Sequence, residues 1–183
     1  AVLLNGISKL DVTSALAETV QLEGEMLTNG PIIKNDWEVM KQDLTWALES
    51  VLSATPARAA VLLVHDNSNN RWIPHALAGV VPYEESLRWT IPTATIRSTP
   101  VLDRFLSGKV KESYLPTLQA LPGKVEFTYL PPNAQEALLL PVQSGENDEK
   151  RVVLVLGSDT AKSFTPRDIA WCQVLASRIG TFV

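Results

Sequence analysis

The stretch SFTPRDIAWCQVLASRIGTFV, residues 163–183, carries several agreeing signals for the start of a helix. Thr165 is placed to accept hydrogen bonds from the N–H groups of the first turn. Pro166 suits the first helical position, where its missing N–H is harmless. Asp168 completes a capping box and faces the positive end of the helix dipole. We therefore predict a helix that begins directly after Thr165.

This C-terminal helix is amphipathic, and it follows the clearest hairpin of the sequence. Phe164 and Ile169 fit a hydrophobic staple across its first turn. EALLLPVQ (136–143) and RVVLVLGSD (151–159) predict two strands that are apolar on both faces and therefore central in a sheet. The helix should return across this hairpin and cover the sheet with one apolar face, formed by Ile169, Cys172, Leu175, Ala176 and Ile179.

A second helix and a second hairpin precede this unit. NDWEVMKQDLTWALESVLS (35–53) has apolar residues at helical spacing, and Asn35 with Glu38 resembles a capping box. RAAVLLVHD (58–66) and RWIPHALAG (71–79) predict paired strands, with Pro74 at a bulge or with its nitrogen facing away from the ladder.

The remaining segments have weaker patterns. Residues 11–27 are only roughly helical and are interrupted by Gly24, so we divide the chain into an N-terminal helical extension or linker (1–35) and a main domain (36–183). Residues 80–135 are irregular and rich in proline, with a short helix expected after Ser98 or Thr99.

Composition excludes several classes of site. The chain has 183 residues, a formal net charge of −4, one cysteine and two histidines. A single cysteine forms no internal disulfide, and the common Cys/His zinc sites need more ligands than this. Lysines and arginines are scattered rather than gathered in a stripe, so we expect no nucleic-acid partner. No apolar run reaches the roughly 20 residues that span a bilayer, so we expect no direct membrane insertion in this segment.

With these elements in order, the chain resembles a GAF domain over residues 36–183. The resemblance is most specific in the last third, where the family has a Leu-x-Pro-Val/Leu element, small residues ending the next strand, and a Phe-Thr/Ser-x-x-Asp helix start. The matching positions here are Leu140, Pro141, Val142, Gly157, Phe164, Thr165 and Asp168. The resemblance implies an α+β fold with a central antiparallel sheet, helices on one face and a pocket on the other, walled by residues 80–135. A PAS-like or profilin-like fold is the structural alternative.

The sequence also departs from ligand-binding members of that family. Bilin-binding members use a cysteine in the middle region, which is absent here, so we expect no covalent bilin. The Asn-Lys-Phe-Asp-Glu signature of cyclic-nucleotide-binding members is also absent. Members that reduce free methionine sulfoxide use several cysteines near the pocket, whereas this chain has only Cys172. The resemblance therefore leaves any cofactor unknown.

Aromatic and charged residues of the middle region are the candidate ligand contacts. The aromatic side chains either wall a pocket or simply pack a long loop. The two arginines either form a fork for an anion or lie on a solvated face, and the histidine is either a hydrogen-bonded strand residue or a ligand contact. The candidates are His75, Tyr83, Trp89, Arg97, Arg104, Tyr114, Phe127 and Tyr129.

Two functions fit these observations, and neither is catalytic, because no nucleophile–base constellation, phosphate loop or carboxylate pair stands out. The first is a regulatory GAF-like domain that binds a small molecule, a protein partner or both, and passes the effect through its terminal helices. The alternative is a ligand-free scaffold or assembly factor for a photosynthetic or other membrane complex. Either function predicts a protein partner or a homodimer, in the cytoplasm or the chloroplast stroma.

Overall fold

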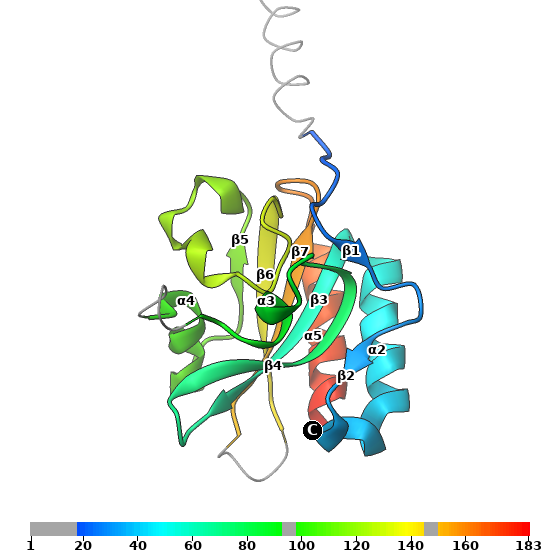
Figure 1. Cartoon of the computed structure of the whole chain (residues 1–183), viewed down its shortest axis with the longest axis vertical. Coiled ribbons are helices and arrows are strands. Elements are labelled where there is room, and N and C mark those ends of the chain that lie inside the picture. The colour runs from blue at the N-terminus through cyan, green and yellow to red at the C-terminus, as the bar shows by residue number, and fades with distance from the viewer. Residues whose placement is uncertain (1–17, 93–97, 145–149) are drawn as a thin grey trace, which may run out of the picture.

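The computed structural model describes residues 18–92, 98–144 and 150–183. Its centre is an antiparallel sheet in the order β1-β4-β3-β7-β6-β5, and β2 also pairs with β4 (Figure 1). The predicted α+β fold with a central antiparallel sheet is thereby confirmed. The strands are β1 (Glu25–Met26), β2 (Ile32–Ile33), β3 (Ala57–Asp66), β4 (Arg71–Val81), β5 (Ser113–Leu115), β6 (Glu136–Val142) and β7 (Val152–Ser158).

Each face of the sheet has its own covering layer. α2 (Lys41–Ala54) and α5 (Pro166–Gly180) pack together on one face, where Leu44, Leu48 and Ile179 are fully buried. Residues 82–135 cover the other face and contribute Leu102, Phe127 and other side chains to a second core. Figure 1 shows these two layers on either side of the strands. The expected arrangement of helices on one face and the irregular middle region on the other is confirmed.

The period of two along β3 explains why its sequence is apolar throughout. Ala60 and Leu62 point to the helical layer, while Val61 and Leu63 point to the middle region. β7 alternates in the same way and is buried along its whole length. Strands that separate two apolar cores have no solvated face, so they lack the polar alternation of a half-exposed strand.

The β3–β4 ladder contains the predicted irregularity at Pro74. The register changes from Leu63 opposite Pro74 to Leu62 opposite Ala76, so His75 is the extra residue of a bulge. Further along β4, Gly79 has φ +77, and a Cβ built there would lie 2.1 Å from the Arg58 carbonyl oxygen. Only glycine fits this position of the strand without displacing backbone.

The start of α5 forms as the sequence predicts. Thr165 Oγ1 accepts from the Asp168 N–H at 3.2 Å, and Asp168 Oδ2 accepts from the Thr165 N–H at 2.8 Å. Phe164 is buried in the helical core, and Ile169 packs against the same core. The predicted apolar face is also confirmed, because Cys172, Leu175, Ala176 and Ile179 are buried there.

The predicted capping box at Asn35 is wrong. A 3-10 helix, η1 (Asn35–Met40), precedes α2, and its cap residue is Lys34, which makes no side-chain cap hydrogen bond. Trp37 instead anchors this segment, since its exposed fraction is only 2%. Burial of the large ring therefore fixes the entry to α2, and not a polar cap.

Residues 18–34 pair with the sheet, and their described part is not helical. Glu25 and Met26 pair with Val81 and Val80, and Ile32–Ile33 pair with Leu77 and Ala76. Gly24 fits closely beneath β4, because a Cβ there would approach the Val81 carbonyl oxygen to 2.3 Å. Residues 1–17 lie outside the described part of the chain, and the division at residue 35 stays a prediction.

The middle region consists of short pieces. These are α3 (Glu85–Trp89), α4 (Pro100–Asp103) and the 3-10 segments η2 (Arg104–Ser107), η3 (Leu118–Ala120) and η4 (Pro122–Glu126). Thr99 is the cap residue of α4, but its hydroxyl donates to Asp103 Oδ1 at 2.8 Å and does not cap the helix. None of the described helices is both long and apolar enough to span a membrane.

Candidate functional site

The middle region contains an apolar groove of about 270 Å³ at its surface. One wall comes from the segment after β4 and the other from η3, η4 and the loop that follows them. None of the lining residues belongs to a strand. They are Pro82, Leu87, Leu118, Gln119, Lys124, Val125, Phe127, Thr128, Leu130, Pro131 and Pro132.

Of the predicted ligand residues, Phe127 lines this groove and Tyr129 lies beside it in the core. Their rings are 6.1 Å apart at 63°, an edge-on arrangement that favours packing. Tyr129 is completely buried, and its hydroxyl has no hydrogen-bond partner within the described residues. Burial raises the pKa of Tyr129 well above its ordinary value. These two rings fill the core between the middle region and the sheet.

Tyr114 lies on the opposite face of the sheet from these two rings. It packs against the helical core, with its ring 6.1 Å from Phe164. Its hydroxyl donates to Glu136 Oε2 at 2.7 Å. The pKa of Tyr114 is raised, first by burial and then by the bonded carboxylate. The structure therefore separates Tyr114 from the predicted aromatic cluster.

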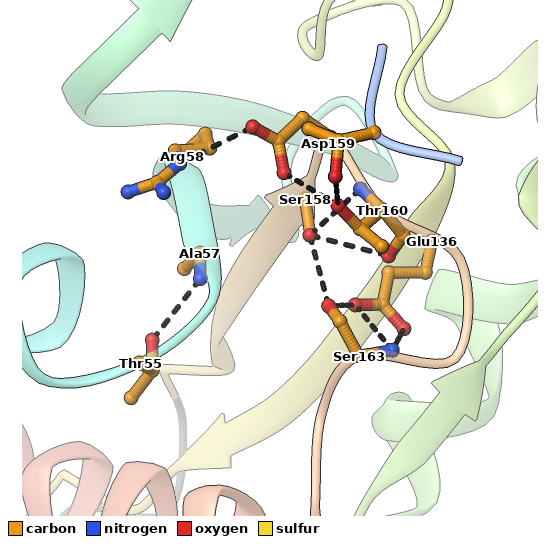
Figure 2. A network of polar contacts seen from close by, with 9 residues as sticks. Thr55, Ala57, Arg58, Glu136, Ser158, Asp159, Thr160 and Ser163 are labelled. Carbon is orange, nitrogen blue, oxygen red and sulfur yellow. Dashed lines mark hydrogen bonds and ion pairs between the residues drawn. The ribbon is translucent and has the colours of Figure 1, made fainter. Parts of the chain in front are cut away.

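Glu136 is the centre of a polar network that the sequence did not reveal (Figure 2). Its side chain is fully buried at the start of β6. Its Oε2 accepts from the Ser163 N–H at 3.1 Å, and its Oε1 accepts from the Ser163 hydroxyl. Ser158, at the end of β7, lies with its hydroxyl 3.1 Å from the Ser163 hydroxyl and accepts from the Thr160 N–H at 3.2 Å.

This network fixes the link between β7 and α5. Figure 2 shows Glu136, Ser158 and Ser163 converging beneath the loop, with Asp159 reaching outward to Arg58. The Arg58 Nε to Asp159 Oδ2 distance is 3.3 Å. Every donor that faces the Glu136 carboxylate is a hydroxyl or a backbone N–H, and no histidine or lysine of the described residues takes part as a base. The arrangement satisfies a buried charge and positions the first turn of α5, a structural role.

The other predicted residues are dispersed. His75 Nε2 lies 3.2 Å from Asp36 Oδ2, and its ring contacts Trp37 on the helical side, where burial lowers its pKa. Tyr83 is 71% exposed and lies next to the groove residue Pro82. Trp89 packs at the edge of the second core beneath Lys34. Arg104 is exposed on η2, and Arg97 lies outside the described residues, so an arginine fork stays a prediction.

Two further buried charges in the middle region were not predicted. Arg88 donates to the Pro82 carbonyl at 2.6 Å and pairs with Glu25 at 2.7 Å, which ties α3 to β1. Glu126 accepts from the Val101 N–H at 3.1 Å and is fully buried. Burial raises the pKa of Glu126 to about 7, although the bond from Val101 opposes the shift. Their isolated positions in irregular segments gave no sequence signal for either role.

The helical layer presents apolar side chains to solvent. Trp46 of α2 is 55% exposed, and Trp171 and Val174 of α5 are 43% and 59% exposed. We call these three residues the helical face. An open hollow of about 640 Å³ lies beside Trp171 and Val174, between the end of α2 at Ala54 and the first half of α5.

Cys172 lies on the buried side of α5 and contributes to the helical core. Burial raises the pKa of its thiol to about 12, so the reactive thiolate is scarce near neutral pH. The groove lies on the other side of the sheet. Among the described residues, no group of three or more His, Cys, Asp or Glu side chains is arranged to hold a metal ion.

Comparison with known proteins identifies both a family and a fold. The model of the CCB2/CCB4 family, described as "Cofactor assembly of complex C", matches residues 1–179. The chloroplastic cofactor-assembly protein CCB4 of Arabidopsis thaliana, named for the same complex C, is 26% identical over 148 residues, which cover 76% of this chain and 43% of the relative. The chain thus spans less than half the length of this relative.

Solved structures with the same fold include GAF domains. A GAF domain/HD domain protein from Geobacter sulfurreducens superposes with a TM-score of 0.56 at 11% identity, covering 79% of this chain and 91% of that chain. A type II free methionine-R-sulfoxide reductase from Thermoplasma acidophilum has a TM-score of 0.57 at 14% identity, covering 79% and 92%. At these identities the likeness shows the fold alone, and it confirms the GAF-like architecture.

Proposed function

The chain belongs to the CCB2/CCB4 family, described as cofactor assembly of complex C, and from this premise we propose that it is a non-enzymatic assembly factor that holds a protein partner. The proposal takes the scaffold alternative of the sequence analysis in preference to the regulatory domain. The chloroplastic relative supports action in a plastid or in a cell with the same complex.

The observation that carries the proposal is the helical face. α2 and α5 already bury one side of each helix against the sheet, so the exposed Trp46, Trp171 and Val174 contribute nothing to that core. Tryptophan is enriched where protein partners bind, because a large ring in a pocket contributes much of the binding free energy. The hollow beside Trp171 offers such a pocket for an apolar side chain of the partner.

The reductase likeness does not support an enzyme here. The only cysteine, Cys172, is buried in the helical core, and its thiol pKa is raised to about 12. The Glu136–Ser158–Ser163 network is closed by its own hydrogen bonds and serves the β7–α5 link. A binding role for the helical face requires none of these groups to react.

The proposal is tested by capture of partners on the purified chain from plastid or cyanobacterial extract. The double variant Trp171→Ser/Val174→Ser removes the apolar contacts and leaves the buried side of α5 intact. Val39→Ser is the matched control, because Val39 is 98% exposed on η1 and lies outside the helical face. We expect a protein that is retained by the native chain and by Val39→Ser and is lost from the double variant.

Equal capture by all three proteins would contradict the proposed face. Analytical ultracentrifugation of the same proteins tests whether the partner is a second copy of the chain. A dimer that dissociates only in the double variant would identify the helical face as a self-association surface.

A further inference from the structure

The apolar groove of the middle region contains a buried hydroxyl without a partner. Thr128 Oγ1 is excluded from solvent and makes no hydrogen bond within the described residues. Thr128 is also one of the residues that line the groove. A buried hydroxyl that lacks a partner is unfavourable, so an acceptor atom bound in the groove would gain from meeting it.

A cation stands on the same groove. Lys124 lines it, and the Lys124 ammonium donates to Gln119 Oε1 at 3.1 Å, a neutral acceptor. No carboxylate forms an ion pair with Lys124 in the described part of the chain. An arriving carboxylate would therefore complete the charge without displacing an existing ion pair.

The second amide atom of Gln119 holds the groove wall in place. Gln119 Nε2 donates to the Pro132 carbonyl at 3.0 Å and to the Ala134 carbonyl at 2.7 Å. Lys124 is thus attached to a side chain that is itself fixed to the opposite end of the loop. The polar groups of the groove are positioned before any ligand binds, which lowers the entropy cost of binding.

We propose that this groove binds a small molecule that has an apolar body and a single carboxylate. Leu118, Phe127 and Leu130 would contact the apolar body, while Thr128 Oγ1 and Lys124 Nζ would donate to the carboxylate. A volume of about 270 Å³ fits a small ligand, below the usual size of drug-like sites. This site is separate from the helical face and does not rest on the assembly role.

The test is an NMR titration of the ¹⁵N-labelled chain with sodium decanoate. 1-Decanol and decylamine serve as probes of the same chain length with a neutral and a positive head group. We expect decanoate to shift the backbone amide signals of residues 118–132 and to leave α5 unchanged. Decanol should bind about tenfold more weakly, the loss expected for one charge-assisted hydrogen bond, and decylamine should not bind there.

Matched variants separate recognition from folding. Lys124→Gln should weaken decanoate binding about tenfold and leave decanol binding unchanged. Thr128→Val keeps the shape and removes the hydroxyl, so it should weaken decanoate binding while the folded chain is as stable as before or more stable. Lys109→Gln, a change of an exposed lysine outside the groove, should alter neither ligand.

Several outcomes overturn the proposal. Equal affinity for decanoate and decanol would reduce the groove to an apolar hollow without carboxylate recognition. Unchanged decanoate binding in Lys124→Gln would remove the lysine from the site. A clear loss of stability in Thr128→Val would show that the hydroxyl has a partner in the free chain, and the absence of any shift at millimolar decanoate would leave no site.

Discussion

The Glu126 carboxylate accepts a hydrogen bond from the backbone N–H of Val101 at 3.1 Å, although the Glu126 side chain is fully buried. This bond joins the end of η4 to the first turn of α4 across 25 residues of sequence. Burial outweighs it, because the pKa of Glu126 is raised from 4.5 to about 7, with Asp103 adding to the rise. A carboxyl group with a raised pKa stabilises the fold when protonated and opposes it when ionised.

The sign of the pH dependence follows from the proton balance. Between pH 4.5 and about 7 the folded chain holds the Glu126 proton more tightly than the unfolded chain, so this group makes stability fall as pH rises. We expect Glu126→Gln to reduce the loss of unfolding free energy between pH 5 and pH 8 by about 2 kcal/mol. Urea denaturation at both pH values measures it. Glu38→Gln, an exposed change, is the control, and the same pH dependence in both variants would contradict the assignment.

The Glu136 network gives a second expectation. Replacing Glu136 by Leu leaves the Ser163 N–H, the Ser163 hydroxyl and the Tyr114 hydroxyl without their acceptor. We expect the free energy of unfolding to fall by roughly 3 kcal/mol, whereas Tyr114→Phe, which removes one bond, should cost about 1 kcal/mol. Equilibrium urea unfolding compares the two variants. Equal, small effects would mean that water replaces the network at no cost.

The capping box at the start of α5 is a local feature with a local cost. Thr165→Ala removes the acceptor for the Asp168 N–H and should destabilise the fold by about 1 kcal/mol. Ser177→Ala, at an exposed position of the same helix, should be neutral or slightly stabilising because alanine is the better helix former. Thermal unfolding of both variants is the measurement. Similar melting temperatures for the two would show that the cap contributes nothing.

Cys172 should behave as a core residue. Its buried thiol, with a pKa raised to about 12, should react with a disulfide reagent at pH 8 only when the chain unfolds. The rate of thiol reaction in native buffer, compared with the rate in urea, measures this. Rapid reaction of the native chain would contradict the burial and would reopen a redox role.

What the sequence could predict was decided by local signals. Thr165 and Asp168 are three residues apart and act on one turn, so the start of α5 was predicted with its cap. Asn35 and Glu38 have the same spacing, yet the burial of Trp37 decides that segment, and burial is not a local property. β1 and β2 have two residues each and exist only through pairing with β4, which the pattern around Gly24 did not reveal.

The candidate site was harder to predict than the fold. Tyr114 and Phe127 are close in sequence, but β5 places Tyr114 against the helical core, while Phe127 enters the core on the other face. Which face a strand residue occupies depends on register, and a shift of one residue reverses it. Glu126 and Glu136 look like ordinary charged residues in the sequence, because burial of a carboxylate becomes visible only when its donors are located.

The helical face is tested most directly by a photo-crosslinking amino acid placed at position 174 of the chain in its own cells. The same group at position 39, where Val39 is 98% exposed outside the face, is the control. We expect a single predominant protein to be joined at position 174 and to be absent at position 39. The same products at both positions, or none at position 174, would contradict a partner bound on α5.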